Sequence, residues 1–234
     1  MASRRDELVG NRFALVGAAL YFMEWVVIPF IPSLPLDKLG DGQAAIAAAY
    51  ANDPWKTGFA AGWFGFVLLG RVAFCAGLRN GFRTSPRELP LADWAFGAMV
   101  LSVGFEVIEY GLVAGGAWLA HGGADPGTIV ALNAAAIGIG HLVFVTLGVS
   151  VFAGSLAMLM SRMFPSWISW LGVFAGGLLV SGAILSSATV GTSGSAHDIG
   201  GVIEGLPVLG FWIWIIATSV VLFRHTPRRE AAVA

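Results

Sequence analysis

The chain has 234 residues, of which 57% are hydrophobic and only 12% are charged, and its mean hydropathy is +0.79. Soluble domains carry about 25% charged residues, so a soluble fold of this composition would leave apolar surface uncovered. The formal net charge of −1 argues against a nucleic-acid partner, because phosphate binding depends on an excess of lysine and arginine. The composition indicates an integral membrane protein.

The first apolar stretch, 13–32, follows three arginines near the N-terminus, which resembles the basic front of a signal peptide. No small-residue cleavage site follows this stretch, and Pro29, Pro32 and Pro35 lie at or just beyond its end. Its length is close to the ~20 residues that one helical crossing requires. We therefore expect an uncleaved first span.

Six apolar stretches are each long enough to cross a hydrocarbon core of about 30 Å. They are 13–32, 57–78, 92–119, 128–160, 166–188 and 199–223. Strands of a membrane barrel would alternate between apolar and polar residues, whereas these stretches are apolar all round. The sequence predicts an all-α integral membrane protein, a bundle of six transmembrane helices that forms a single domain over residues 1–234.

Orientation follows from the placement of lysine and arginine, which are enriched in cytoplasmic segments. With the N-terminus inside, the outer segments hold only Lys38 and Lys56. The inner segments then hold Arg4, Arg5, Arg12, Arg79, Arg83, Arg87, Arg162, Arg224, Arg228 and Arg229. This asymmetry predicts a plasma-membrane protein with both termini in the cytoplasm.

The connections carry their own signals. The alanine-rich stretch 43–51 predicts a short surface helix in the first outer loop, and the Ser/Gly/Thr-rich stretch 186–200 predicts a mobile loop. Asp53-Pro54 and Asp125-Pro126 are typical of helix starts. Three small-xxx-small motifs predict close helix contacts within the chain. They are Gly58-x-x-x-Gly62, Gly111-x-x-x-Gly115 and Gly172-x-x-x-Gly176.

Five ionisable residues lie inside the predicted spans, namely Glu24, Arg71, Glu106, Glu109 and His141. Such a group costs about 2.5–3.5 kcal/mol at mid-bilayer and usually faces the bundle interior with a partner. Glu106 and Glu109 are three residues apart, so they share one helix face. Because all five fall at similar depths, we expect one buried polar site. A sixth candidate, Glu204 in the last span, is interpreted as a residue that faces a loop or extends toward the membrane surface, and not as a ligand.

Other interpretations of these residues stay open. A pair of Arg71 with a glutamate can simply lock helix packing. Glu106, Glu109 and His141 together offer oxygen and imidazole ligands for a metal. The Glu-x-x-His pattern of di-iron bundles is absent from the sequence, however, so we predict no metal site. The single cysteine, Cys75, is interpreted as a small buried apolar residue, and the sequence identifies no cofactor.

Three hypotheses for function compete. In the first, the site binds a lipophilic small molecule or acts on it by acid–base chemistry. The residues assigned to it are the acid–base groups Glu24, Glu106, Glu109 and His141 and the binding groups Arg71, Tyr110 and Trp25. In the second, the same groups relay protons in a small proton- or ion-coupled transporter. In the third, the chain is a non-catalytic subunit or regulator. Membrane lipid is the partner common to all three.

Two stretches carry a resemblance to a known family. One is Phe105-Glu106-Val107-Ile108-Glu109-Tyr110-Gly111, and the other runs from Met163 to Gly172 and leads into Gly176-Gly177. Over residues 23–185 the chain resembles the actinobacterial multi-pass proteins grouped as domain-of-unknown-function 4386. The arginine that often opens their third-span motif is replaced here by Gly104 or Phe105. The resemblance implies a helical membrane bundle of bacterial origin and implies no activity.

Overall fold

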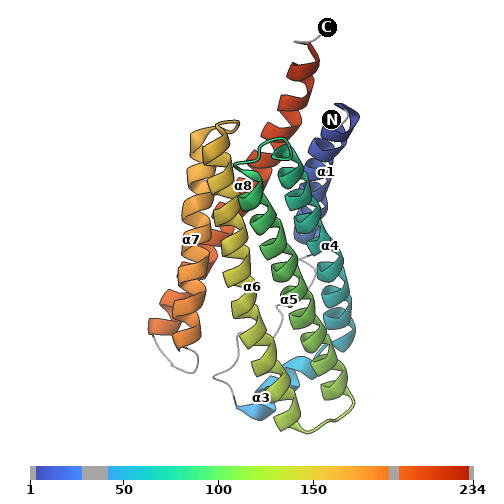
Figure 1. The fold of residues 1–234 in the computed structure, drawn as a ribbon. Helices are drawn as coiled ribbons and strands as arrows, with labels where there is room; N and C mark the ends of the chain where they lie inside the picture. Colours follow the sequence, from blue (N-terminus) through green and yellow to red (C-terminus); the bar gives the residue numbers. More distant parts are fainter. Residues whose placement is uncertain (1–3, 28–41, 190–194, 232–234) are drawn as a thin grey trace.

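The computed structural model describes residues 4–27, 42–189 and 195–231, and it describes side chains at 12–26, 42–187 and 206–224. The described residues form helices and no strand. The helices, shown in Figure 1, are α1 (Arg4–Phe22), α2 (Glu24–Val27), α3 (Gln43–Ala51), α4 (Pro54–Gly81), α5 (Leu89–His121), α6 (Pro126–Ser161), α7 (Ser166–Thr189) and α8 (Ser195–Ala231).

The long helices form a closed ring in chain order. α1 packs on α4, α4 on α5, α5 on α6, α6 on α7 and α7 on α8, and α8 closes the ring against α1. Both termini lie at one end of the ring, together with the α4–α5 and α6–α7 connections (Figure 1). The α5–α6 connection and α3 lie at the other end. This is the up-and-down arrangement that short connections produce, because consecutive helices must then be antiparallel neighbours.

Five helical segments are long and apolar enough to cross a membrane. They are Pro54–Gly81, Leu89–His121, Pro126–Ser161, Ser166–Ser187 and Leu206–Arg224. The all-helical class is therefore confirmed, together with five of the six apolar stretches. The first stretch, 13–32, falls on α1 and α2 and continues past the described residues. A crossing there stays a prediction.

Local signals at the helix starts are confirmed. Asp53 precedes Pro54 and accepts a hydrogen bond from the Lys56 amide at 3.1 Å, and Asp125 accepts one from the Thr128 amide at 3.2 Å. Both caps satisfy amides that a helix cannot pair within itself. The predicted surface helix is α3, which packs on α5 and α6.

The predicted loop 186–200 is wrong over much of its length. Helix α7 continues to Thr189 and α8 begins at Ser195, and residues 190–194 lie outside the described chain. The Ser187 hydroxyl donates to the Ala183 carbonyl at 2.7 Å. Serine in a helix can bond its own preceding turn in this way, so a serine-rich composition did not end the helix.

The closest helix contacts are made by glycines. A Cβ on Gly70 of α4 would lie 2.4 Å from the carbonyl oxygen of Gly17 on α1, and a Cβ on Gly176 of α7 would lie 2.6 Å from that of Gly148 on α6. Only glycine permits backbones to approach so closely.

Two of the three predicted glycine motifs do not mark such contacts. A Cβ on Gly62, Gly111 or Gly115 would meet no atom within 4 Å among the described residues, and one on Gly58 would meet only the Trp118 ring, at 3.4 Å. The third motif, Gly172 and Gly176, does face neighbouring helices. A spacing of four places two glycines on one face of a helix, but it does not determine what that face meets.

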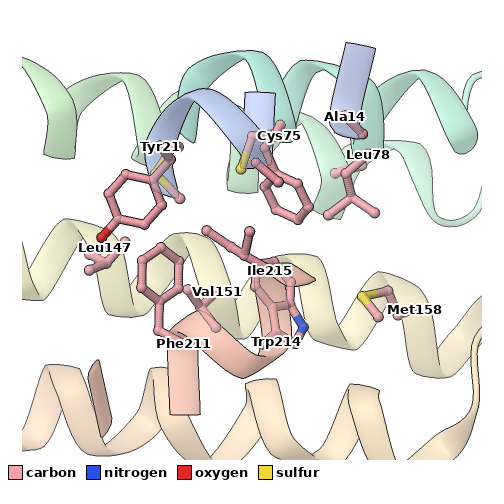
Figure 2. Packing of buried hydrophobic residues seen from close by; sticks show 14 of the residues in the cluster. Ala14, Tyr21, Cys75, Leu78, Leu147, Val151, Met158, Phe211, Trp214 and Ile215 are labelled. Carbon is pink, nitrogen blue, oxygen red and sulfur yellow. The ribbon is translucent and has the colours of Figure 1, made fainter. Parts of the chain in front are cut away.

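Aromatic and aliphatic side chains fill the interior of the ring. Figure 2 shows Phe211, Trp214 and Ile215 of α8 lying against Tyr21 of α1 and Val151 of α6. Trp214 is fully buried, and the interior is packed at this level. Polar side chains inside the ring are therefore confined to a few positions, and we expect a functional site at one of them.

Candidate functional site

A break between α1 and α2 positions the first acidic residue. The Met23 amide bonds to the Leu20 carbonyl at 3.1 Å and the Val26 amide to the Met23 carbonyl at 3.2 Å, so the turn is tighter than an α-helix. The Trp63 indole donates to the same Met23 carbonyl at 3.2 Å. The break makes Glu24 the first residue of α2, where the helix dipole favours a negative charge.

Arg71 of α4 is the buried cation of the site. The residue is 2% exposed, and its guanidinium forms an ion pair with Glu106 of α5. The guanidinium carbon lies 5.5 Å from the centroid of the Tyr21 ring, within the range of a cation–π contact. The Tyr110 hydroxyl donates to the other Glu106 carboxylate oxygen at 3.3 Å. Arg71 and Glu106 are therefore held in place by their own ion pair, by the Tyr21 ring and by the Tyr110 hydroxyl group.

Two further aromatic side chains support Tyr21. Its hydroxyl accepts a hydrogen bond from the Trp212 indole of α8 at 2.8 Å. The Trp212 ring in turn lies edge-on to Trp25 of α2, with 4.3 Å between ring centroids. Trp25 is 43% exposed and its ring lies against Trp212, so it is at the periphery of the site.

Two more carboxyl groups accompany the ion pair. Glu24 interacts electrostatically with Glu106 and Arg71, and its Oε2 atom is buried with no hydrogen-bond partner among the described residues. Glu109 interacts electrostatically with Glu106. We refer to Glu24, Arg71, Glu106 and Glu109 as the charge cluster. It holds three carboxyl groups and one guanidinium, contributed by α2, α4 and α5.

The charge cluster reaches α6 through Glu109. A Cβ on Gly140 would lie 3.0 Å from the Glu109 Oε1 atom, so the carboxyl group rests against the α6 backbone. His141 is the next residue, and successive residues on an α-helix are rotated by about 100°. Within the described residues, neither an ion pair nor a hydrogen bond joins His141 to the charge cluster, and its Nε2 atom is buried without a partner. Arg71 and Glu106 are thus joined by an ion pair, Glu24 and Glu109 interact with them electrostatically, and the grouping of His141 with these four stays a prediction.

The remaining predicted residues are placed as follows. Tyr110 lies on Glu106, as described above. Glu204 lies on α8 where side chains are not described. Cys75 is buried, as expected, with its sulfur 3.9 Å from the Ser150 hydroxyl. Among the described residues, no group of three or more His, Cys, Asp or Glu side chains could hold a metal ion.

Sequence reasoning missed three aromatic residues of the site. Tyr21, Trp63 and Trp212 each use a polar atom to hold a neighbour in place. A weak signal existed for Tyr21, because it precedes Glu24 by three residues and so shares its side of the chain. Trp212 comes from the far end of the sequence, and no local pattern connects it with Tyr21.

Comparison with protein-family models, with curated proteins and with solved structures gave no match to this chain. The resemblance to domain-of-unknown-function 4386 stays a prediction. The functional argument therefore depends on the geometry of the site.

Proposed function

We propose that the chain is a six-span plasma-membrane protein whose charge cluster binds a lipophilic small molecule and exchanges a proton with its polar group. The arginine asymmetry of the sequence supports cytoplasmic termini. Both termini lie at one end of the helix ring (Figure 1). A chain that crosses the membrane an even number of times has both termini on the same side, so this arrangement supports six crossings. The five apolar helices and the apolar stretch 13–32 supply six crossings.

The observation that carries the proposal is the excess of carboxyl groups over cations in a site whose cation is buried and whose carboxyl groups are partly buried. A packing lock needs only Arg71 and Glu106, which already neutralise each other. Glu24 and Glu109 add two groups that can give or accept a proton and that packing does not require. The unpartnered Oε2 atom of Glu24 leaves one of these groups ready to bond a ligand.

Each residue then has a distinct role in this proposal. Glu24 contacts the polar group of the ligand and exchanges a proton with it. The ion pair of Arg71 and Glu106 fixes the charge beside that group, and Tyr110 holds Glu106 in orientation. The partly exposed Trp25 forms the apolar wall on the side from which a lipid-soluble molecule arrives.

The test is native mass spectrometry of protein purified from its own membranes. The expected result is a lipophilic molecule bound to the wild type and lost from Glu24→Gln, which keeps the shape of the side chain and removes its charge. Glu88→Gln is the matched control, because Glu88 lies at the start of α5 away from the charge cluster. Retention of the same molecule by both Glu24→Gln and Glu109→Gln would contradict the proposal.

One observation supports proton-coupled transport as a second candidate. Glu106 interacts electrostatically with both Glu24 of α2 and Glu109 of α5, and the Glu109 carboxyl group lies against the α6 backbone at Gly140. Such a series of carboxyl groups can relay protons. Proton flux into proteoliposomes that Glu109→Gln abolishes would favour this candidate, whereas the absence of flux at any imposed gradient would count against it.

A further inference from the structure

A groove lies on the outer surface of the bundle, where α5 and α6 pack side by side. Its volume is about 440 Å³, within the range of about 300–1,000 Å³ that is typical of small-molecule sites. The Trp94 and Leu101 side chains are exposed, so the groove opens away from the interior of the ring. We refer to it as the α5–α6 groove. Its lining includes Asp93, Trp94, Gly97 and Leu101 of α5 and Thr146 and Val149 of α6.

Two hydrogen bonds join α5 to α6 on either side of the groove. The Ser150 hydroxyl donates to the Ala95 carbonyl at 2.7 Å, and the Ser102 hydroxyl donates to the Val143 carbonyl at 3.2 Å. Both serines are buried. The α6 residues of the groove lie between these two bonds along the chain, so the bonds fix the separation of the two helices over the length of the groove.

Most of the groove is apolar. Gly97 contributes no side chain, and a Cβ there would meet no atom within 4 Å among the described residues. The Thr146 hydroxyl donates to the Leu142 carbonyl of its own helix at 2.7 Å, so it offers no unpaired donor to the groove. Both α5 and α6 are long and apolar enough to cross a membrane. The groove therefore suits a hydrocarbon chain of the bilayer.

One end of the groove carries charge. Asp93 accepts a hydrogen bond from the Nε atom of Arg79, in the last turn of α4, and both side chains are nearly half exposed. The exposed Trp94 ring beside Asp93 is typical of the membrane interface. Leu101 lies about 12 Å further along α5. The groove thus extends from a charged rim at the level of the lipid headgroups into the hydrocarbon layer.

We propose that the α5–α6 groove binds one acyl chain of a phosphatidylethanolamine molecule whose headgroup is held by Arg79 and Asp93. A guanidinium has five N–H donors, and Arg79 uses its Nε atom for Asp93, so its other donors can bind a phosphate. The Asp93 carboxylate accepts hydrogen bonds from the ammonium group. A choline headgroup has no N–H to donate, and a glycerol headgroup has no cation for Asp93.

The charged rim also favours a lipid over a second copy of the chain. A protein partner seated on the groove would remove the Arg79–Asp93 pair from water, and such desolvation can exceed the attraction within the pair. A zwitterionic headgroup replaces water with a phosphate and an ammonium group. This inference requires that the chain lies in a membrane, and it does not depend on the ligand proposed for the charge cluster.

The test is native mass spectrometry of the full-length protein in detergent, first freed of lipid and then given phosphatidylethanolamine or phosphatidylglycerol. Phosphatidylglycerol is the comparison because Arg83 and Arg87, exposed in the α4–α5 connection, would favour an anionic headgroup if net charge decided binding. We expect the wild type to retain one phosphatidylethanolamine molecule at collision energies that remove phosphatidylglycerol. Asp93→Asn should abolish this preference.

Gly97→Leu tests the groove itself, because the new side chain fills it without meeting a described atom at the Cβ position. Gly62→Leu is the matched control, since Gly62 is an exposed glycine of α4 with equally open space. We expect Gly97→Leu to lose the phosphatidylethanolamine and Gly62→Leu to retain it.

Three results would overturn the inference. They are equal retention of both lipids by the wild type, equal retention of phosphatidylethanolamine by Gly97→Leu and Gly62→Leu, and a dimer of the wild type that Gly97→Leu dissociates. The two proposed sites can fail separately. Glu24→Gln should keep the phosphatidylethanolamine, and Gly97→Leu should keep the molecule that Glu24→Gln loses.

Discussion

The charge cluster and the buried polar groups of α6, α7 and α8 differ in how they are paired. In the charge cluster, Arg71 is paired with Glu106 and covered by Tyr21. The polar side-chain atoms of Ser155, Ser169, Trp214 and Thr218 are buried, and none has a hydrogen-bond partner among the described residues. An ion buried without a counter-ion costs several kcal/mol, whereas an unpaired buried hydroxyl group costs about 1–3 kcal/mol. A buried charge therefore needs a partner within the protein more strongly than a buried hydroxyl group does.

The largest expected effect follows from removing the cation of the charge cluster. Arg71→Met leaves Glu106 buried beside Glu24 and Glu109 without compensation, and breaking a buried pair in this way costs about 3–5 kcal/mol. We expect a large fall in the melting temperature in detergent.

Two comparisons sharpen that result. The double variant Arg71→Met with Glu106→Gln should recover much of the lost stability, because no unpaired charge of the pair remains. Arg79→Gln breaks the exposed ion pair with Asp93, and surface pairs contribute about 0–1 kcal/mol. Equal losses for Arg71→Met and Arg79→Gln would show that burial of the charge has no energetic importance here.

A smaller effect comes from the same substitution made at two glycines that lie in close helix contacts. Gly70→Ala places a methyl group 2.4 Å from the Gly17 carbonyl oxygen, a backbone atom that cannot rotate away. Gly172→Ala meets the Ser155 and Trp214 side chains, which can move. Overpacking typically costs about 1–3 kcal/mol, and we expect Gly70→Ala to lie at the upper end of that range and Gly172→Ala below it.

Gly62→Ala is the control for Gly70→Ala on the same helix, since its methyl group meets no described atom within 4 Å. In the helix interior this change should be neutral or stabilise by about 0.5–1 kcal/mol. Unfolding curves measured for Gly62→Ala, Gly70→Ala and Gly172→Ala give the order of their losses in stability. A smaller loss in Gly70→Ala than in Gly172→Ala would contradict the distinction between backbone and side-chain contact.

The smallest effect lies outside both regions, on α3. The Tyr50 hydroxyl donates to the Asn133 Oδ1 atom at 2.8 Å, and burial together with the nearby Glu109 charge raises the pKa of Tyr50 from 10.0 to about 12. Because the pKa is higher in the folded state, the stabilisation is complete below pH 10 and is lost as the pH rises through 12. Hydrogen exchange of the α3 amides should therefore accelerate over this range.

Tyr50→Phe provides the matched control for the alkaline transition. It removes both the hydrogen bond and the titrating group, so α3 should exchange somewhat faster at neutral pH, by about 0.6 kcal/mol if the bond is typical of membrane helices. The additional acceleration between pH 10 and 12 should be absent. If the variant shows the same alkaline acceleration as the wild type, another group is responsible.

Particular residues show how far the sequence predicts the site. The cost of burying Arg71 and Glu106 predicted that they would find partners, and they are paired. The same reasoning placed His141 with them by depth, which does not specify direction around a helix, and this grouping stays a prediction. Gly140 of α6 lies against the Glu109 carboxyl group. The direction depends on how α5 and α6 pack, which local sequence does not encode.

The sequence by itself determined the chemistry of the chain: apolar stretches that must form helices, capping residues that start them, and a few ionisable groups that need compensation. These follow from local composition, because a lone helix already satisfies its backbone and each buried charge carries its own cost. Tertiary structure alone decided which groups meet. The contacts of Gly17 with Gly70, of Tyr21 with Trp212, and of Gly172 with Ser155 and Trp214 each join distant segments. Such contacts depend on the rotation and packing of whole helices.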